Sequence, residues 1–224
     1  SIRRQRQMCI RDRGIDVVED VCADAATEVI RGFLTRIIDG RPMVTVKVAT
    51  TLDGSIATAL GDSQWITGEL SRALAHGMRA RHDAILVGGR TAIADNPSLT
   101  CRLPGMEGAS PIRVVISGRE KLPLAHDLVS SARNTPTWIL MPAAGDAARK
   151  RAYSDSGIKP IEVPIDKEGN LDLDQSLRAL GNMGITRLMV EGGGRIISGL
   201  LKADLVDRLV SVSYTHLTLP TNRE

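Results

Sequence analysis

Aromatic side chains are scarce in this sequence, because its 224 residues include only two Trp, two Tyr and one Phe. The core must therefore consist of Val, Ile, Leu, Ala and Met, and few rings are available to stack on nucleic-acid bases. No apolar run approaches the roughly 20 residues that span a bilayer. We therefore expect neither a nucleic-acid partner nor a membrane partner.

Cysteine is equally rare. Cys9, Cys22 and Cys101 are scattered, and none of them forms a C-x-x-C pair. This usage is typical of a reducing compartment rather than of a disulfide framework. We therefore expect a cytoplasmic protein.

The formal net charge of +3 is concentrated at the N-terminus, because residues 1–13 hold five arginines and one aspartate. A basic arm for nucleic acid is one interpretation. We favour another, because residues 1–13 and 213–224 resemble translated sequencing-adapter sequence. On that interpretation both ends are non-native tails and take no part in function.

Strands and helices are predicted to alternate between these tails. A short strand is expected at 15–18. A helix from Asp24, its cap, to about Ile38 has an apolar stripe of Ala25, Val29, Leu34 and Ile37. A second helix is predicted after Thr67, as its cap, with a stripe that includes Leu70 and Leu74. A third runs over 172–181 with Asp172 as cap, and a fourth starts near Arg195.

Short apolar runs between these helices predict the strands. One contains Val44, Val46 and Val48 in alternation, and the others are expected at 84–87, 112–117, 137–141, 161–163, 188–190 and about 205–212. Strands that alternate with helices predict an α/β fold with a mostly parallel sheet.

Three consecutive glycines, Gly192–Gly194, separate the strand at 188–190 from the following helix, in the stretch "LMVEGGGRIISGLL". Free amides and the helix dipole at such a position bind phosphate groups. The dinucleotide fingerprint G-x-G-x-x-G is not met, because Ile197 stands in place of its last glycine. A tight turn without a ligand and a phosphate-binding turn are both compatible with this pattern.

A second glycine pair ends the strand at 84–87, in "VGGRTAIADNPSLTCR". Ligands of open α/β sheets lie beyond the carboxyl ends of the strands. Thr91, Asp95 and Arg102 follow the pair and could reach such a crevice, or could belong to an ordinary solvated loop.

The motifs "RPMVTVKVATTLDGSIA", "SQWITG", "ILVGGRTAIADNPSLTCR", "PIRVVISG" and "LMVEGGGRIISGLLKADLVDRL" resemble the reductase domain of bacterial bifunctional riboflavin biosynthesis enzymes. The resemblance covers residues 41–212. It implies a dihydrofolate-reductase-like fold with a mostly parallel central sheet flanked by helices. It also implies NADPH-dependent reduction of 5-amino-6-(5-phosphoribosylamino)uracil to the ribitylamino product.

The resemblance implies two sets of site residues. Substrate contacts fall on Ser63, Arg79, Leu99, Arg102 and Glu191. NADPH contacts fall on Ala49, Trp65, Thr91, Asp95, Ser117, Gly193, Gly194, Arg195, Ile196, Ile197, Ser198 and Gly199.

These residue types suit the implied chemistry. The guanidinium groups of Arg79 and Arg102 can grip a 5-phosphate, and Glu191 can accept hydrogen bonds from sugar hydroxyls. Asp95 is the candidate proton donor, or it only orients the nicotinamide amide. Lys47 points either to the cleft or to solvent. His76 and His82 are interpreted as surface or capping groups.

Members of that family begin with a zinc deaminase carrying H-x-E and P-C-x-x-C, and both motifs are missing here. We therefore expect no deaminase activity and no metal. Residues 14–40 are interpreted as the remnant of a preceding deaminase domain, and the full-length protein is expected to be a homodimer. Two alternatives stay open: a related reductase acting on another pyrimidine or pterin, and an inactive nucleotide-binding fragment.

Overall fold

A computed structural model describes residues 8–50, 54 and 68–213, so that two of the predicted site residues, Ser63 and Trp65, lie outside the described residues. The chain divides into two compact units, Ser1–Arg31 and Gly32–Glu224. In the first unit, residues 8–11 form one helical turn. The strand predicted at 15–18 is wrong, because residues 15–20 adopt no regular structure and Val18 is 80% exposed.

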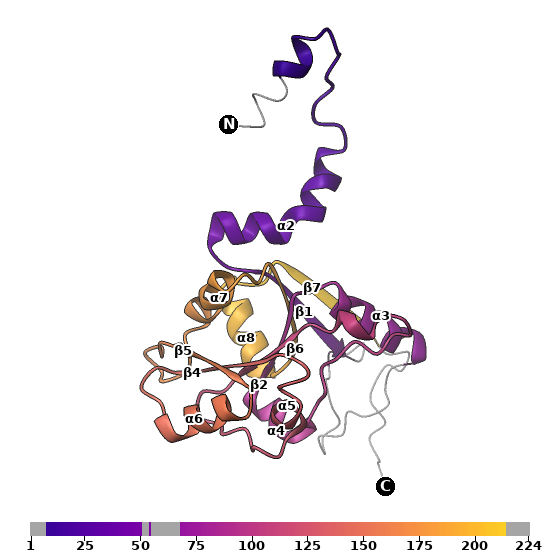
Figure 1. Ribbon diagram of the computed structural model, residues 1–224. Helices are drawn as coiled ribbons and strands as arrows, with labels where there is room; N and C mark the ends of the chain where they lie inside the picture. The colour runs from indigo at the N-terminus through magenta and orange to yellow at the C-terminus, as the bar shows by residue number, and fades with distance from the viewer. Residues whose placement is uncertain (1–7, 51–53, 55–67, 214–224) are drawn as a thin grey trace. The chain divides into compact units, whose positions relative to one another are not determined.

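The second unit is built on a seven-stranded sheet with the order β5-β4-β3-β2-β6-β1-β7 (Figure 1). Every pair of neighbouring strands is parallel, as the alternation of strands and helices predicts. The strands are β1 (Met43–Thr50), β2 (Ala84–Gly88), β3 (Ile112–Ile116), β4 (Thr137–Pro142), β5 (Lys159–Val163), β6 (Arg187–Gly192) and β7 (Arg208–Ser213).

Helices connect these strands. They are α2 (Ala23–Asp39), α3 (Glu69–Ala80), α4 (Gly89–Asp95), α5 (Asp127–Ser130), α6 (Ala147–Asp155), α7 (Leu173–Asn182) and α8 (Gly194–Lys202). The predicted cap of α7 is confirmed, because the Asp172 carboxylate accepts a hydrogen bond from the Gln175 amide at 3.0 Å. Gly68 is the N-cap residue of α3, and Thr67, the predicted cap, lies outside the described residues. The predicted cap of α2 is wrong, because this helix begins at Ala23 and Asp24 lies in its first turn.

Each face of the sheet carries its own apolar cluster, because successive strand residues point to opposite faces. Val44, Val46 and Val190 belong to the cluster that Leu177 and Leu180 of α7 and Leu200 of α8 complete. The opposite cluster contains residues of β2, β3 and β4 together with side chains of α4, α5 and α6: Ile85, Val87, Ala92, Val115, Leu128, Val129, Ile139 and Tyr153. The sheet is therefore covered on both faces, as parallel sheets require.

The predicted apolar stripes of two helices do not face this core. Leu70 and Leu74 of α3 are 76% and 64% exposed, and Ile37 of α2 is 63% exposed. Instead, α2 buries Gly32 and Thr35, and a Cβ on Gly32 would stand 2.6 Å from Cγ of Arg187. The periodicity of the sequence therefore identifies the helices correctly but not their buried faces.

Candidate active site

The candidate site lies at the carboxyl edge of the sheet, where all seven parallel strands end. Val46 of β1 pairs with Val190 of β6. The next residues on the two strands, Lys47 and Glu191, therefore share one face of the sheet. This face lies beneath α3, and Glu191 directly precedes the three glycines. A side-chain pocket and a glycine turn thus meet at Glu191.

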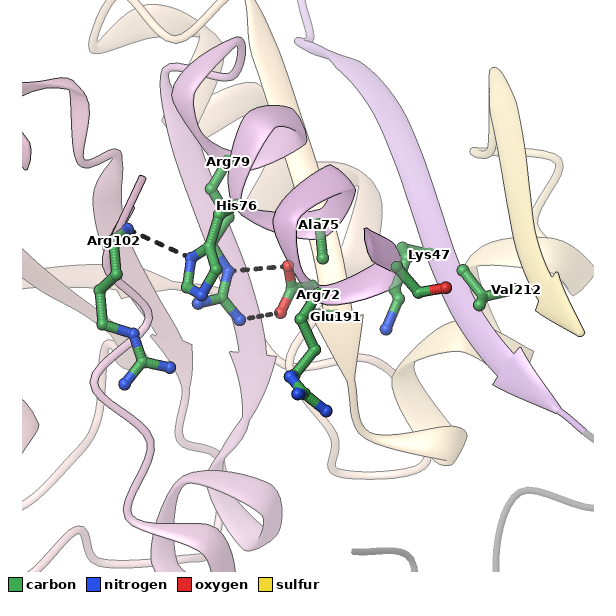
Figure 2. Close-up of a pocket in the computed structure, with 9 residues that line it drawn as sticks. Lys47, Arg72, Ala75, His76, Arg79, Arg102, Glu191 and Val212 are labelled. Carbon is green, nitrogen blue, oxygen red and sulfur yellow. Dashed lines mark hydrogen bonds and ion pairs between the residues drawn. The ribbon is translucent and has the colours of Figure 1, made fainter. Parts of the chain in front are cut away.

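The pocket has a volume of about 180 Å³ and lies between α3, the ends of β1, β6 and β7, and the segment around Arg102 (Figure 2). Three of the substrate residues implied by the family resemblance, Arg79, Arg102 and Glu191, meet here. The lining residues are Lys47, Ser71, Arg72, Ala75, His76, Arg79, Arg102, Glu191 and Val212.

Arg79 and Glu191 form a bidentate ion pair within the pocket (Figure 2). Nε of Arg79 donates to Oε1 of Glu191 at 3.0 Å, and Nη2 donates to Oε2 at 2.6 Å. Nη1 of Arg79 donates to the carbonyl of Thr100 at 3.0 Å. The two side chains are 15% and 9% exposed. The guanidinium of Arg79, which is predicted to grip a phosphate, thus holds Glu191 and a loop carbonyl in this structure.

The pocket carries an excess of positive charge. Its lining includes four basic side chains, those of Lys47, Arg72, Arg79 and Arg102, against the single carboxylate of Glu191, which Arg79 already neutralises. Burial and the nearby charge of Arg79 lower the pKa of His76 below its ordinary value of 6.5, so the imidazole is neutral at pH 7. The remaining cations suit an anionic group such as a phosphate.

Close packing accounts for two of the three glycines in the turn, and a positive φ is a further reason for one of them. Gly193 has φ of +93°, and a Cβ on it would stand 3.3 Å from Cα of Gly88, while a Cβ on Gly192 would stand 2.8 Å from Cγ2 of Thr91. Packing between the β2–α4 and β6–α8 turns therefore explains these two glycines. Nothing lies within 4 Å of the corresponding position on Gly194.

Free amides lie at the same turn. The amides of Ile196 and Ile197 donate to the carbonyl of Gly193 at 2.8 and 3.0 Å. Among the described residues, the amides of Gly194 and Arg195 have no backbone acceptor. These two N–H groups and the open space at Gly194 fit a phosphate group of a nucleotide cofactor.

The other predicted site residues are spread around this edge. The side chain of Leu99 is 4% exposed in the apolar core, so that only its backbone could contact a substrate. Ser117 is 5% exposed, and its hydroxyl donates to the carbonyl of Glu120. Asp95 is exposed at the end of α4 and does not line the pocket, and Ala49 is half-buried on β1.

The sequence interpretation missed part of the lining. His76, which the sequence indicates as a surface or capping group, lines the pocket, and so do Ser71, Arg72 and Ala75 from the same helix. Their spacing of three to four residues is the available signal, because it places them on the face of α3 that carries Arg79. Val212 enters from the edge strand β7, and nothing in the sequence indicates that contact.

No group of three or more His, Cys, Asp or Glu side chains among the described residues is placed to hold a metal ion. No described helix is long and apolar enough to cross a membrane.

The fold and the site together define an α/β domain with a cation-lined pocket at the carboxyl edge of a parallel sheet. The sequence profile of the RibD C-terminal domain matches residues 42–216, and the chain belongs to this family. The match begins and ends close to the predicted limits of 41 and 212.

Curated relatives and solved structures agree with this assignment. The riboflavin biosynthesis protein RibD of Bacillus amyloliquefaciens is 36% identical over 200 residues, covering 89% of this chain and 53% of that protein. RibD of Aquifex aeolicus is also 36% identical, over 90% of this chain and 54% of its own length. The chain thus spans about half the length of these relatives.

The structure of Acinetobacter baumannii RibD superposes with a TM-score of 0.77 at 29% identity, covering 94% of this chain and 56% of that one. A Thermotoga maritima protein described as a diaminohydroxyphosphoribosylaminopyrimidine deaminase/5-amino-6-(5-phosphoribosylamino)uracil reductase superposes with a TM-score of 0.75 at 28% identity, covering 95% of this chain and 55% of that one. The predicted dihydrofolate-reductase-like fold is confirmed.

Proposed function

We propose that this chain reduces 5-amino-6-(5-phosphoribosylamino)uracil to its ribitylamino product with NADPH, as a reductase of riboflavin biosynthesis. Family membership supports the reaction class, because a relative with the same fold is described by that reductase activity. The observation that carries the proposal is the junction at Glu191. There a cation-lined pocket adjoins a turn with two free amides.

The substrate phosphate is proposed to bind in the pocket. Lys47 and Arg102 are the cations that we assign to it, because Arg79 is already paired with Glu191. A guanidinium can donate two parallel hydrogen bonds to a phosphate, and an ammonium adds a point charge. The paired Glu191 carboxylate keeps lone pairs for ribose hydroxyls. We propose that the sugar bound in this way has its C1 toward the glycine turn.

The cofactor is proposed to lie across the glycine turn. When bound, a dihydronicotinamide supplies the hydride for reduction of the sugar carbon. The Gly194 and Arg195 amides would hold a cofactor phosphate, and Thr91, Ser117, Ala49 and residues 196–199 would surround the rest. Asp95, exposed at the end of α4, is proposed to orient the carboxamide or to supply a proton.

The test follows the oxidation of NADPH by its absorbance, with the phosphorylated substrate and with its dephosphorylated analogue. Arg102→Ala should raise KM about tenfold or more for the phosphorylated compound, because one charge-assisted contact is lost. KM for the analogue should hardly change. Arg151→Ala, which removes an exposed arginine on α6, is the matched control.

Three outcomes separate the candidate functions. An equal loss for both compounds contradicts the assignment of the phosphate to this pocket. Turnover of a non-phosphorylated pterin or pyrimidine in preference to the phosphoribosyl compound favours the related reductase. NADPH that neither binds nor reacts identifies an inactive fragment.

The quaternary state is proposed separately. Strand β7 lies at one edge of the sheet formed by the described residues, and Leu209 on it is 56% exposed. A second copy of the chain could cover this edge, which supports a homodimer of the longer protein. Sedimentation of that protein would test it, and a monomer at micromolar concentration would contradict it.

A further inference from the structure

The segment Thr100–Arg102 is held by side chains on both of its sides. The carbonyl of Thr100 accepts from Nη1 of Arg79 at 3.0 Å, and the amide of Cys101 donates to the hydroxyl of Ser110 at 3.0 Å. The amide of Arg102 donates to Nδ1 of His76 at 3.3 Å (Figure 2). Leu99, immediately before the segment, has the unusual φ of +54°. The path of this segment is therefore fixed by side chains of α3 and by Ser110 rather than by its own local preference.

The bond to His76 requires a neutral imidazole. Nδ1 lies 3.1 Å from the Thr100 carbonyl and 3.3 Å from the Arg102 amide nitrogen. Nδ1 can bond to only one of them at a time: with the ring hydrogen on Nε2 it accepts from the Arg102 amide, and with the hydrogen on Nδ1 it donates to the Thr100 carbonyl. We assign the first tautomer, because the Arg102 amide has no other acceptor among the described residues. The Thr100 carbonyl already accepts a hydrogen bond from Nη1 of Arg79. A hydrogen on Nδ1 would remove the bond from Arg102.

The Arg102 guanidinium depends on this anchor. Within the described part of the chain, its side chain makes no hydrogen bond or ion pair, and the residue is exposed. The direction of the side chain is therefore set by where the backbone holds it. The charged groups that face His76 are Arg79, Arg102 and Glu191, with Lys47 and Arg72 elsewhere in the lining.

We propose that His76 is a positioning residue: its neutral ring fixes the Arg102 backbone and thereby holds the Arg102 guanidinium at the pocket. The inference rests on the proposed function, in which Arg102 binds the phosphate. His82 provides a contrast on the same helix. Its Nδ1 lies 2.7 Å from the Met78 carbonyl of α3 itself, and it does not line the pocket.

The test is a double-variant cycle on the binding of ribose 5-phosphate, measured by calorimetry at pH 7.5 with the full chain. Arg102→Ala should weaken binding about tenfold, and His76→Leu about fivefold, because one contact of the loop is lost. In the Arg102→Ala background, His76→Leu should cost nothing further, since a residue that acts through Arg102 has nothing left to position. His82→Leu is the matched control and should bind like the parent protein.

Two conservative variants keep the test decisive even if His76→Leu does not fold. His76→Asn places an amide oxygen near the position of Nδ1 and should recover most of the affinity. His76→Gln places its polar atoms near the position of Nε2 and should bind as weakly as His76→Leu.

Two results would overturn the inference: a His76→Leu effect of full size in the Arg102→Ala background, or equal affinities of His76→Asn and His76→Gln. Unchanged binding in Arg102→Ala would instead overturn the proposed phosphate pocket itself. The two failures are therefore distinguishable.

Discussion

Gly88 and Gly193 approach each other so closely that a Cβ on Gly193 would stand 3.3 Å from both Cα and N of Gly88. This contact joins the turn after β2 to the turn after β6. Gly193 also has a φ of +93°, which residues other than glycine rarely adopt. The central glycine of the triplet is therefore required by packing and backbone conformation, whereas Gly194 has open space around it.

Substitutions at these two adjacent glycines should have opposite consequences. Gly193→Ala should lower the free energy of unfolding by roughly 1–3 kcal/mol, because it adds a strained φ and a close contact. Gly194→Ala should leave stability unchanged or slightly higher, and it should weaken NADPH binding if the cofactor lies on this turn. Urea unfolding and NADPH fluorescence titration measure the two effects. Full NADPH affinity in a folded Gly194→Ala variant would argue against a cofactor phosphate at this turn.

The pair of Arg79 and Glu191 should show strong energetic coupling. Removal of either partner leaves the other charge in a mostly buried position, at 15% and 9% exposure. Arg79→Leu and Glu191→Leu should each cost about 2 kcal/mol, and the double variant should cost less than their sum by about 1–3 kcal/mol. Urea unfolding of the three variants gives the coupling. Strict additivity would mean that the ion pair is not formed in solution.

Acid should destabilise the fold through His76 and His82. Burial lowers the pKa of both below 6.5, so that the unfolded chain binds more protons than the folded one under acidic conditions. Because stability rises with pH wherever the unfolded state binds more protons, it should fall as the pH decreases below 6.5. Thermal unfolding at several pH values measures the slope. The double variant His76→Asn, His82→Asn should flatten it, and an unchanged slope would contradict this origin.

Removal of the Asp207 carboxylate should lower the free energy of unfolding more than removal of a carboxylate from an exposed ion pair. Its Oδ2 accepts from Nη1 of Arg41 at 2.6 Å and from the Val44 amide at 2.7 Å, so that it ties the start of β7 to β1. Asp207→Ala should cost roughly 1–3 kcal/mol in unfolding free energy. Asp174→Ala, which breaks the exposed pair with Arg178, is the control and should change stability little. Equal losses in the two variants would show that the Asp207 bonds contribute no more to stability than an exposed ion pair.

Much of the fold followed from local pattern. The short apolar runs at 84–87 and 188–190 predicted β2 and β6, since runs of three or four apolar residues between turn signals are typical of buried strands. Asp172 predicted its helix start because a carboxylate cap acts within one turn. The exposed Leu70 and Leu74 were misassigned, because helical periodicity does not reveal which face a neighbour covers.

Three members of the candidate site are predicted from the sequence, but their arrangement is not. The family resemblance named Arg79, Arg102 and Glu191, and the structure brings them to one pocket. The ion pair joins residues 112 positions apart in the sequence, so no local pattern could indicate it. Arg113, which lies outside the site, likewise makes contacts that no local pattern indicates. It is 1% exposed and donates to Thr135 and Thr137, while burial lowers its pKa to about 10.

The alternation of strands and helices, the parallel sheet and the sheet edge that carries the candidate site all follow from the order of apolar, polar and turn residues. These features depend on backbone periodicity and on turn residues, which act over a few neighbours. The folded structure is needed to tell which glycine is required for packing, which arginine is already paired and which histidine contacts the Arg102 segment. Those assignments depend on contacts between distant segments, and such contacts exist only once the sheet has formed.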